Sequence, residues 1–339
     1  MASSIAATCC RFPTSLCLPT CKRKSWSGSI MKENVIIDFN KVTKMYGRKP
    51  GLIEGTFGIQ QGQITAFVGK NGAGKTTTIK LMMGFLVPDK GQILIKGKPL
   101  PRNPNNDDIG YLPEIVKFPG LYTPKKLFRV LAGMRRVPGP GYLDNINKMA
   151  EILDIKGSLN SRLGTFSKGM LQKVAILQAF IHNPNIVILD EPTSGLDPIA
   201  RNNLFYILKA QQKQGKTIIV SSHNLDELEP LADFYVFFDN SFVLKAISKA
   251  EIDRLSKTCV KIKELDSLQL EKLRASLGGK NLVIENDRIL LERQVPINHL
   301  LSCLSQNNVE IISVEQSGAS VKDYYFQLIN QEDRLASLS

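Results

Sequence analysis

The stretch that decides the fold is GKNGAGKT at residues 69–76. It matches G-x4-G-K-[S/T] and stands between an apolar run at 64–68 and a helical pattern through 80–85, which is the setting this motif needs. Glycines in such a turn let successive backbone N–H groups point inward at phosphate oxygens, and the following helix presents its positive end. Lys75 is expected to reach the β- and γ-phosphates of a nucleotide, and the Thr76 hydroxyl is expected to bind Mg²⁺. The alternative is a chance glycine-rich turn.

Apolar strand-like runs alternate with helical patterns around this loop, which predicts an α/β fold with a mostly parallel sheet. The pattern from 124 to 181 is helical and is broken at 137–141 (VPGPG). Strands are expected at 35–39, 64–68, 92–95, 185–189 and 217–220, and a hairpin at 235–238 with 242–244.

Composition limits the class of protein. The chain has 339 residues, of which 43% are apolar and 22% charged, as in ordinary globular proteins. It has no run of 18 apolar residues, so no transmembrane helix is expected. The net charge of +13 suits phosphate ligands, nucleic acid or an anionic membrane surface, although a mixed-charge surface with a cationic bias explains it equally well.

The two ends differ from the middle. Residues 1–30 are basic, rich in Ser and Thr, free of acids and hold four of the six cysteines, so they are expected to be a targeting-like or disordered extension, with Met31 as an alternative start. The cysteine spacing there is not a usual zinc pattern. From 249 onward the order βαββαβ predicts a small α+β domain of ferredoxin-like type. The expected division is 1–30, 31–248 and 249–339.

Two further strand ends carry polar side chains. NIVILDE at 185–191 ends in Asp190, which can hold the Mg²⁺ shell, and Glu191, which can accept a proton from an attacking water. His223 follows the strand at 217–222. Because parallel strand ends converge where ligands bind, His223 is expected to contact the γ-phosphate or to orient the water. Taken singly, each of these residues is more often a solvated strand end.

Two helix starts also stand out. Ser167 in FSKGM is a plausible N-cap, and Asp197 followed by Pro198 in SGLDP has the pattern of an N-cap with proline at the first helical position. A plain capped helix explains each of them. A second anion-binding helix end is the functional alternative for Ser167.

Six short motifs in one order carry a resemblance that none carries alone: GKNGAGKTT, GYLPE, FSKGM, NIVILDEP, SGLD and SSH. The sequence over about 34–244 resembles the ATP-binding cassette (ABC) ATPases, the nucleotide-binding subunits of ABC transporters. This resemblance implies a P-loop NTPase with a RecA-like core and a helical subdomain at about 113–184.

The resemblance also implies site roles. Glu191 is the general base and His223 the switch histidine, while Thr76, Glu114 and Asp190 serve the metal. Ser167 and Gly169 form the signature that closes over the nucleotide of a partner subunit. Tyr46 matches the aromatic that stacks on adenine, although a packing role explains it as well. The residues implied in nucleotide binding are Tyr46, Gly69, Asn71, Gly72, Ala73, Gly74, Lys75, Thr76, Thr77, Ser167 and Gly169.

Two motifs depart from the family pattern, at three positions. Glu114 stands where glutamine is usual and adds a negative charge beside the phosphates. Lys168 and Met170 replace glycine and glutamine in the signature. Lysine here, with GYLPE and VKDYYFQL at 321–328, is similar to the drug, bacteriocin and sodium exporter branch.

The function that this resemblance implies is that of an ATP-binding and ATP-hydrolysing subunit, with ATP and Mg²⁺, that powers a separate membrane permease, with export as the expected direction. One phosphate loop and one signature imply a second ABC subunit, a homodimer being expected, at the cytoplasmic face of the cell membrane, or in an organelle if residues 1–30 are a transit peptide. No nucleic-acid partner is expected. The alternatives are a soluble ABC-type ATPase acting on ribosomes or nucleic acid, which salt-sensitive binding would favour, and a module that holds ATP without hydrolysing it.

Overall fold

The computed structural model describes residues 34–100, 108–137, 139–255, 257–263, 272–273, 282–285, 288–292, 297–317 and 320–337. The prediction for residues 1–30 lies outside this part of the chain, and so does the first helix expected in the βαββαβ order, at 267–277, apart from two of its residues.

Within the described residues, ten strands form one large sheet in the order β5-β4-β1-β2-β10-β9-β3-β8-β7-β6. Its half from β9 to β6 is parallel, and every residue of β3, β7 and β8 is buried. The other half is mainly antiparallel. The mixed α/β architecture predicted from the sequence is therefore confirmed. The strands are β1 (Val35–Tyr46), β2 (Lys49–Gln60), β3 (Ile64–Val68), β4 (Lys90–Ile95), β5 (Lys98–Pro99), β6 (Ile109–Leu112), β7 (Ile186–Asp190), β8 (Thr217–Ser222), β9 (Phe234–Asp239) and β10 (Phe242–Ser248).

The parallel half determines where the site lies. Neighbouring parallel strands all end at the same edge of the sheet, and ligands bind at that edge. Asp190 at the end of β7 pairs in register with Ser221 of β8, and Val68 at the end of β3 pairs with Ser222. The loop that follows β3 and the carboxylates that follow β7 are therefore brought together by strand register.

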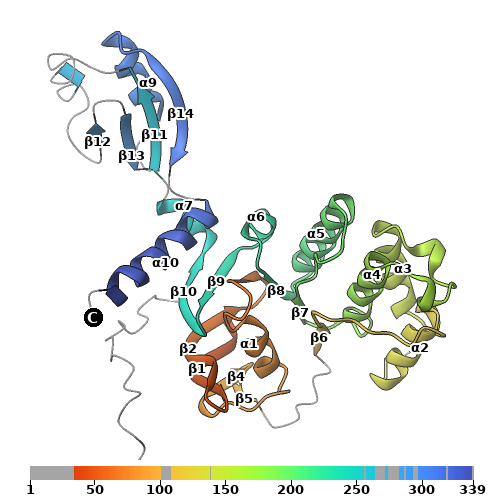
Figure 1. Ribbon diagram of the computed structural model, residues 1–339. Coiled ribbons are helices and arrows are strands. Elements are labelled where there is room, and N and C mark those ends of the chain that lie inside the picture. The colour runs from red at the N-terminus through yellow and green to blue at the C-terminus, as the bar shows by residue number, and fades with distance from the viewer. Residues whose placement is uncertain are drawn as a thin grey trace, which may run out of the picture.

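Helices cover this sheet and extend from it at one end (Figure 1). α1 (Lys75–Met82) follows β3, and α5 (Pro198–Lys213) and α6 (Leu225–Leu228) lie on either side of β8 in the chain. The helical end consists of α2 (Pro124–Met134), α3 (Tyr142–Ile152) and α4 (Lys168–Ala179), with short 3₁₀ turns η2 (Lys156–Ser158) and η3 (Leu163–Thr165). The VPGPG segment separates α2 from α3 because two prolines and two glycines do not continue a helix.

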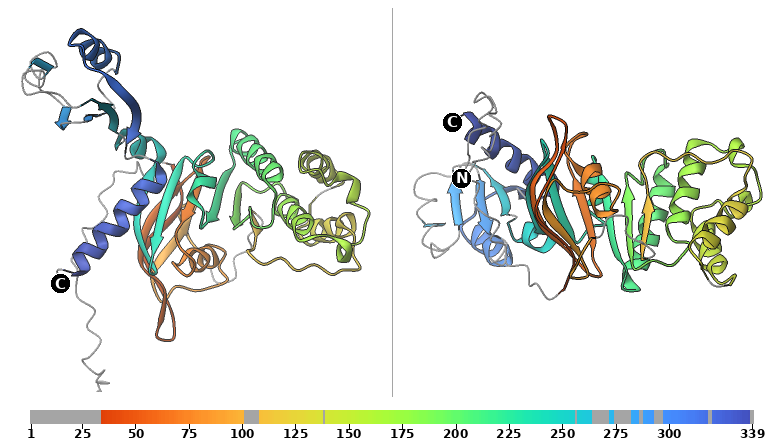
Figure 2. Two further views of the ribbon diagram at one scale, coloured as in Figure 1. Left: turned by 45° about the horizontal axis from the view of Figure 1, so that its top comes forward. Right: turned by 90° about the horizontal axis from the view of Figure 1, so that it is seen from below.

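A second sheet lies beyond β10. Its strands are β11 (Lys257–Ile262), β12 (Leu282–Glu285), β13 (Arg288–Glu292) and β14 (Ile311–Ser317), in the order β12-β13-β11-β14 with antiparallel neighbours, together with α9 (Ile297–Gln306). The chain enters this part through α7 (Lys249–Leu255) and leaves it through α10 (Val321–Ser337). α10 returns to the large sheet and runs beside β9 and β10 (Figure 2).

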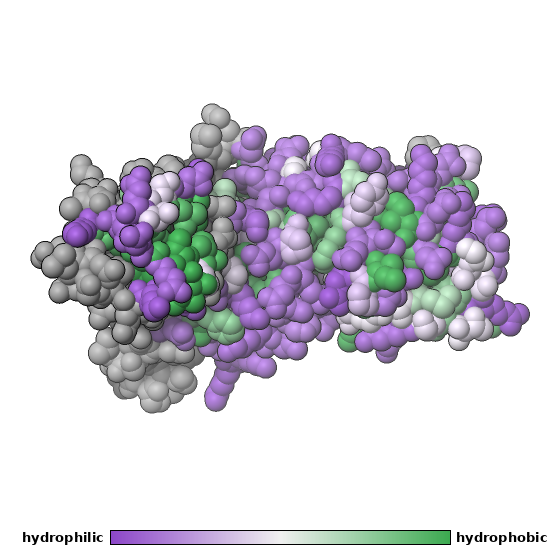
Figure 3. Space-filling model, turned by 90° about the horizontal axis from the view of Figure 1, so that it is seen from above, coloured by the Kyte–Doolittle hydropathy of each residue, from purple (hydrophilic) through white to green (hydrophobic). Residues whose placement is uncertain are grey.

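The surface is mostly hydrophilic when it is seen from above, with a hydrophobic patch over the C-terminal part at the left (Figure 3). β14 carries exposed Ile312 and Val314 in this part of the molecule. None of the described helices is both long and apolar enough to cross a membrane.

Candidate functional site

The glycine-rich loop at 69–76 connects β3 to α1, and two of its positions require glycine. A Cβ on Gly69 would lie 2.4 Å from the backbone oxygen of Phe238, which no side chain tolerates. Gly74 has φ +110° and precedes the first helical residue, Lys75. The helix thus begins within the loop motif itself, earlier than the apolar pattern at 80–85 indicates.

The Lys75 side chain is buried, and it reaches back from the start of α1 to the first residues of the loop. Its Nζ donates to the backbone oxygens of Gly69 at 2.6 Å and Lys70 at 3.3 Å, and it lies 3.8 Å from Oε1 of Glu191. Burial lowers the pKa of Lys75, and the charges of Glu191, Asp190 and Glu114 oppose this shift. A cation is therefore held where phosphate oxygens would enter the loop.

The carboxylate pair at the end of β7 is held by Ser221. Its Oγ donates to Oδ1 of Asp190 at 2.5 Å and accepts from the backbone N–H of Glu191 at 2.9 Å. The Thr76 side chain lies close enough to lower the pKa of Asp190, so the start of α1 and the carboxylate are neighbours. Sequence reasoning gave Ser221 no role. The available signal was its place in the SSH triplet, at the end of a strand next to the NIVILD strand.

The oxygen atoms around Asp190 fit a hard cation. Oδ2 of Asp190 and Oε1 of Glu191 are buried without a hydrogen-bond partner. Burial raises the pKa of Asp190, because an ionised carboxyl loses its hydration there. Carboxylate and hydroxyl oxygens are the ligands that Mg²⁺ takes in phosphoryl-transfer sites. Glu114 is exposed two residues beyond β6, and its charge acts on both Lys75 and Asp190.

Glu191 and His223 are brought together across β7 and β8. His223 Nδ1 lies 2.9 Å from Oε2 of Glu191, and the His223 side chain is 60% exposed. Burial raises the pKa of Glu191, whereas the charges of His223 and Lys75 oppose the rise. Glu191 also has φ +50°, in the left-handed region that non-glycine residues seldom adopt. Backbone strain and shifted pKa values both cluster at catalytic sites, and Glu191 shows both.

Tyr46 lies next to the loop. It ends β1 and is 45% exposed, and its hydroxyl is 3.5 Å from Oγ1 of Thr77. Its ring lies so close to Gly51 that a Cβ there would be 2.7 Å from it. The structure thus places an exposed aromatic ring beside the helix that starts at Lys75.

Ser167 and Gly169 lie at the start of α4, away from the phosphate loop of the same chain. The Ser167 side chain caps α4 by accepting from the N–H of Met170 at 3.3 Å, which confirms the predicted cap. A Cβ on Gly169 would be 2.8 Å from the oxygen of Gly195, so the start of α4 packs closely on the 194–198 turn. α4 lies toward the helical end in all three ribbon views, away from α1 (Figures 1 and 2). The predicted cap at Asp197 is also confirmed, since its Oδ1 accepts from the N–H of Ala200 at 2.8 Å.

A polar junction that sequence reasoning missed lies behind these groups. Glu227 of α6 accepts from the Thr193 hydroxyl at 2.7 Å and from Nδ2 of Asn224 at 3.1 Å, and pairs with Nη1 of Arg201 at 3.1 Å. It therefore joins the segment after Glu191, the segment after His223 and α5. The only local signal was a glutamate four residues after the histidine.

Comparison with known proteins identifies the family of this chain. Residues 53–194 match the family model for ABC transporters. The bacitracin transport ATP-binding protein BcrA of Bacillus licheniformis is 30% identical over 87% of this chain and 98% of its own length. The Nod factor export ATP-binding protein I of Burkholderia orbicola is 30% identical over 58% of this chain and 66% of its own. A solved ATP-binding subunit of an ABC transporter aligns with a TM-score of 0.59 and 27% identity, covering 80% of this chain and 99% of that one.

The fold and the phosphate loop define a P-loop ATPase, and the chain belongs to the ATP-binding proteins of ABC transporters. It is an ATP-binding and ATP-hydrolysing subunit of such a transporter. The transport names of these relatives give no support to an ATPase that acts on ribosomes or nucleic acid.

Proposed function

We propose that the loop at 69–76 holds the phosphates of ATP and that Glu191 is the general base for hydrolysis. The observation that carries this proposal is the cluster of Lys75 Nζ, Glu191 Oε1 and Asp190 at one edge of the sheet. When ATP binds, the Lys75 ammonium group leaves the backbone oxygens that it contacts and binds the β- and γ-phosphates. Tyr46 stacks on adenine in this proposal. The remaining loop contacts come from Gly69, Asn71, Gly72, Ala73, Gly74, Thr76 and Thr77.

Hydrolysis then follows from the carboxylate geometry. Glu191 takes a proton from water as the water oxygen forms a bond to the γ-phosphorus and the bond to the ADP oxygen breaks. His223 holds the Glu191 carboxylate in place through Nδ1 and, with its exposed ring, reaches toward the γ-phosphate. Mg²⁺ bound by Thr76, Asp190 and Glu114 would neutralise charge on the phosphates. Glu114, a carboxylate at this position, adds one negative charge to that shell.

We infer that two chains complete two ATP sites. Ser167 and Gly169 lie at the start of α4, toward the helical end of the same chain, so they suit the nucleotide of a second chain better than their own. A homodimer of this chain supplies both halves. The domain division that we propose is an ATPase domain at 31–248, with its helical subdomain at about 113–184, and a C-terminal accessory domain of ferredoxin-like type at 249–339.

We further propose that the subunit binds a separate membrane permease at the cytoplasmic face of a membrane and drives export. The export names of relatives support the direction. The helical region offers the surface, because Ile115, Leu121 and Met134 are apolar there and 72%, 81% and 76% exposed. Residues 1–30 would direct the chain to an organelle if they are a transit peptide. No nucleic-acid partner is proposed.

The nucleotide proposal is tested by equilibrium dialysis of the full chain with MgATP. Lys75→Ala is expected to abolish detectable binding and turnover. Lys80→Ala is the matched control, because Lys80 is an exposed lysine on the same helix. Unchanged ATP binding by Lys75→Ala would overturn the proposed role of the loop.

A further inference from the structure

The C-terminal helix α10 packs on the ATPase core although it follows the accessory sheet in the chain. Val321 and Tyr325 are 1% and 4% exposed and belong to the same hydrophobic cluster as β3, β7 and β8. The rings of Tyr325 and Phe237 stack with their centroids 5.6 Å apart. Burial of this kind fixes the helix on β9, so the accessory sheet is joined to the core at both of its ends, through α7 and α10.

The Tyr325 hydroxyl reaches the back of the phosphate loop. It donates to the backbone oxygen of Phe238 at 3.4 Å. Burial raises the pKa of Tyr325, and the nearby backbone N–H of Lys70 lowers it. That Phe238 oxygen is also the atom that a Cβ on Gly69 would strike. The Tyr325 phenol therefore holds the end of β9 through the same backbone oxygen that lies against Gly69, at the point where the loop turns away from β3.

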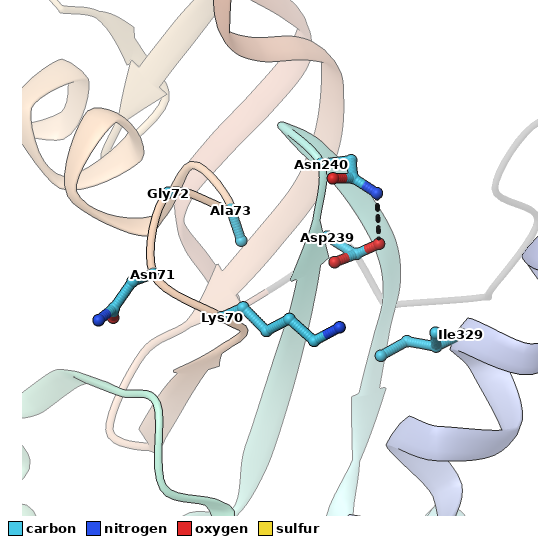
Figure 4. A pocket seen from close by; sticks show the side chains of 7 residues that line it. All are labelled: Lys70, Asn71, Gly72, Ala73, Asp239, Asn240 and Ile329. Carbon is cyan, nitrogen blue, oxygen red and sulfur yellow. Dashed lines mark hydrogen bonds between the residues drawn. The ribbon is translucent and has the colours of Figure 1, made fainter.

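A pocket of about 210 Å³ extends this contact along the loop (Figure 4). One side is formed by Lys70, Asn71, Gly72 and Ala73, and the other by Asp239, Asn240 and Ile329 of α10. The Lys70 side chain extends across the pocket toward Ile329. The backbone N–H of Ser241 donates to the oxygen of Ala73 at 3.2 Å and holds the β9–β10 turn against the same loop.

The other end of α10 contacts the segment that follows His223. Lys322 Nζ lies 3.1 Å from Oδ2 of Asp226 on α6, and α6 also carries Glu227 of the polar junction. Both side chains are about half exposed, so this ion pair contributes little energy by itself. It shows, however, that α10 contacts two elements of the site: β9, which lies against the loop, and α6, which follows His223.

We propose that α10 is a positioning element of the ATP site, with Tyr325 as its positioning residue, and that it links the accessory domain to the phosphate loop. The loop must present its backbone N–H groups toward phosphate oxygens, and the Tyr325 hydroxyl holds the Phe238 peptide against Gly69 at the start of the loop. A displacement of the accessory domain that moves α10 will therefore change the affinity for ATP. This proposal rests on the proposed phosphate role of the loop.

The test compares Tyr325→Phe with Tyr324→Phe in the full chain. Tyr325→Phe removes only the hydroxyl and keeps the ring on Phe237, whereas Tyr324 is the neighbouring tyrosine, whose ring also lies near Phe237. Loss of one hydrogen bond is expected to weaken MgATP binding by about three- to tenfold. The KM for ATP rises by the same factor with kcat unchanged, and the backbone amides of the loop at 70–73 exchange faster with solvent. Tyr324→Phe is expected to leave all three unchanged.

The outcomes separate this inference from the proposed function. If Lys75→Ala abolishes ATP binding while Tyr325→Phe binds ATP as the wild type does, the loop is the ATP site and the positioning role of α10 is wrong. If Tyr325→Phe changes kcat rather than KM, or if Tyr324→Phe has the same effect, the role assigned to the hydroxyl is wrong as well. If Lys75→Ala leaves ATP binding unchanged, the proposed function fails first, and this inference fails with it.

Discussion

His223 Nδ1 lies 2.9 Å from Oε2 of Glu191, and this contact joins the ends of two adjacent parallel strands. The other Glu191 oxygen, Oε1, is buried without a hydrogen-bond partner and faces Lys75 at 3.8 Å. The two oxygens of one carboxylate thus have different environments. One is held by the imidazole, and the other faces the phosphate loop, where it can accept a proton.

The first prediction is that removal of His223 shifts the pH dependence of turnover. Glu191 accepts a proton only when it is ionised, so turnover rises as the pH passes its pKa. Burial raises this pKa and the charge of His223 lowers it. In His223→Ala the pKa rises further, and the acid limb of the kcat profile moves to higher pH.

Measurement of kcat against pH for the wild type and His223→Ala checks this sign. His182→Gln is a control, since the His182 ring contacts the backbone oxygen of Ile109 rather than a carboxylate. An acid limb that stays in place or moves to lower pH in His223→Ala would show that the histidine does not act on Glu191.

Ser221→Ala is expected to loosen both carboxylate residues. The change removes a donor to buried Asp190 and an acceptor for the Glu191 N–H, so the free energy of unfolding falls by about 1–3 kcal/mol. Urea denaturation measures the loss. Ser222→Ala is the matched control, because the neighbouring Ser222 Oγ accepts from the Asn224 N–H. Equal turnover in the two variants would contradict the role given to Ser221.

Glu227→Gln is expected to lower turnover while the Kd for MgATP stays the same. The junction links the segment after Glu191 to the segment after His223, and neither Thr193 nor Asn224 is placed on the nucleotide in this account. Loss of the charged pair with Arg201 is also expected to lower the free energy of unfolding by about 1–3 kcal/mol. Glu229→Gln is the control, since Glu229 pairs with Lys249 instead. A higher Kd for MgATP with unchanged kcat would show that Glu227 contributes to nucleotide binding and does not position the catalytic residues.

Gly69→Ala is expected to damage the loop even though alanine is small. The added Cβ lies 2.4 Å from the Phe238 oxygen, and a steric conflict with backbone costs about 1–3 kcal/mol. ATP binding is expected to weaken along with stability. Gly157→Ala is the control, because a Cβ there meets nothing within 4 Å. If Gly69→Ala is as stable as Gly157→Ala and binds ATP equally well, the loop can shift to accommodate the Cβ without loss of free energy, which would contradict this prediction.

The sequence predicted the parallel strands β3, β7, β8 and β9, because buried central strands such as 185–189 and 217–220 are continuous apolar runs. It missed β2 and β6 for physical reasons. β2 has glycine at positions 51, 55 and 58 among mixed polar residues, and the four residues of β6 include Gly110. β1 runs seven residues past its predicted end; only Val42 is buried in this extension, so it carries no apolar run, and its residues pair with β2.

Site residues within a motif were predictable, but those that act through tertiary contact were not. Lys75 and Asp190 stand in recognisable local patterns, each just after or at the end of a buried strand. The order of these parallel strands in the sheet then brings the two residues together. Ser221, Glu227 and Tyr325 owe their places to register or to a helix that returns from far along the chain. No local pattern specifies such a contact.

The central claim is that Glu191 takes the proton from the attacking water, and Glu191→Gln tests it most directly. We predict that the variant binds MgATP with a Kd close to that of the wild type while kcat falls by at least about 100-fold, the usual contribution of a general base. Both quantities are measured on the full chain, by dialysis and by phosphate release. A kcat within about threefold of the wild type, with binding intact, would contradict the account, because the chemical step would then not depend on this carboxylate.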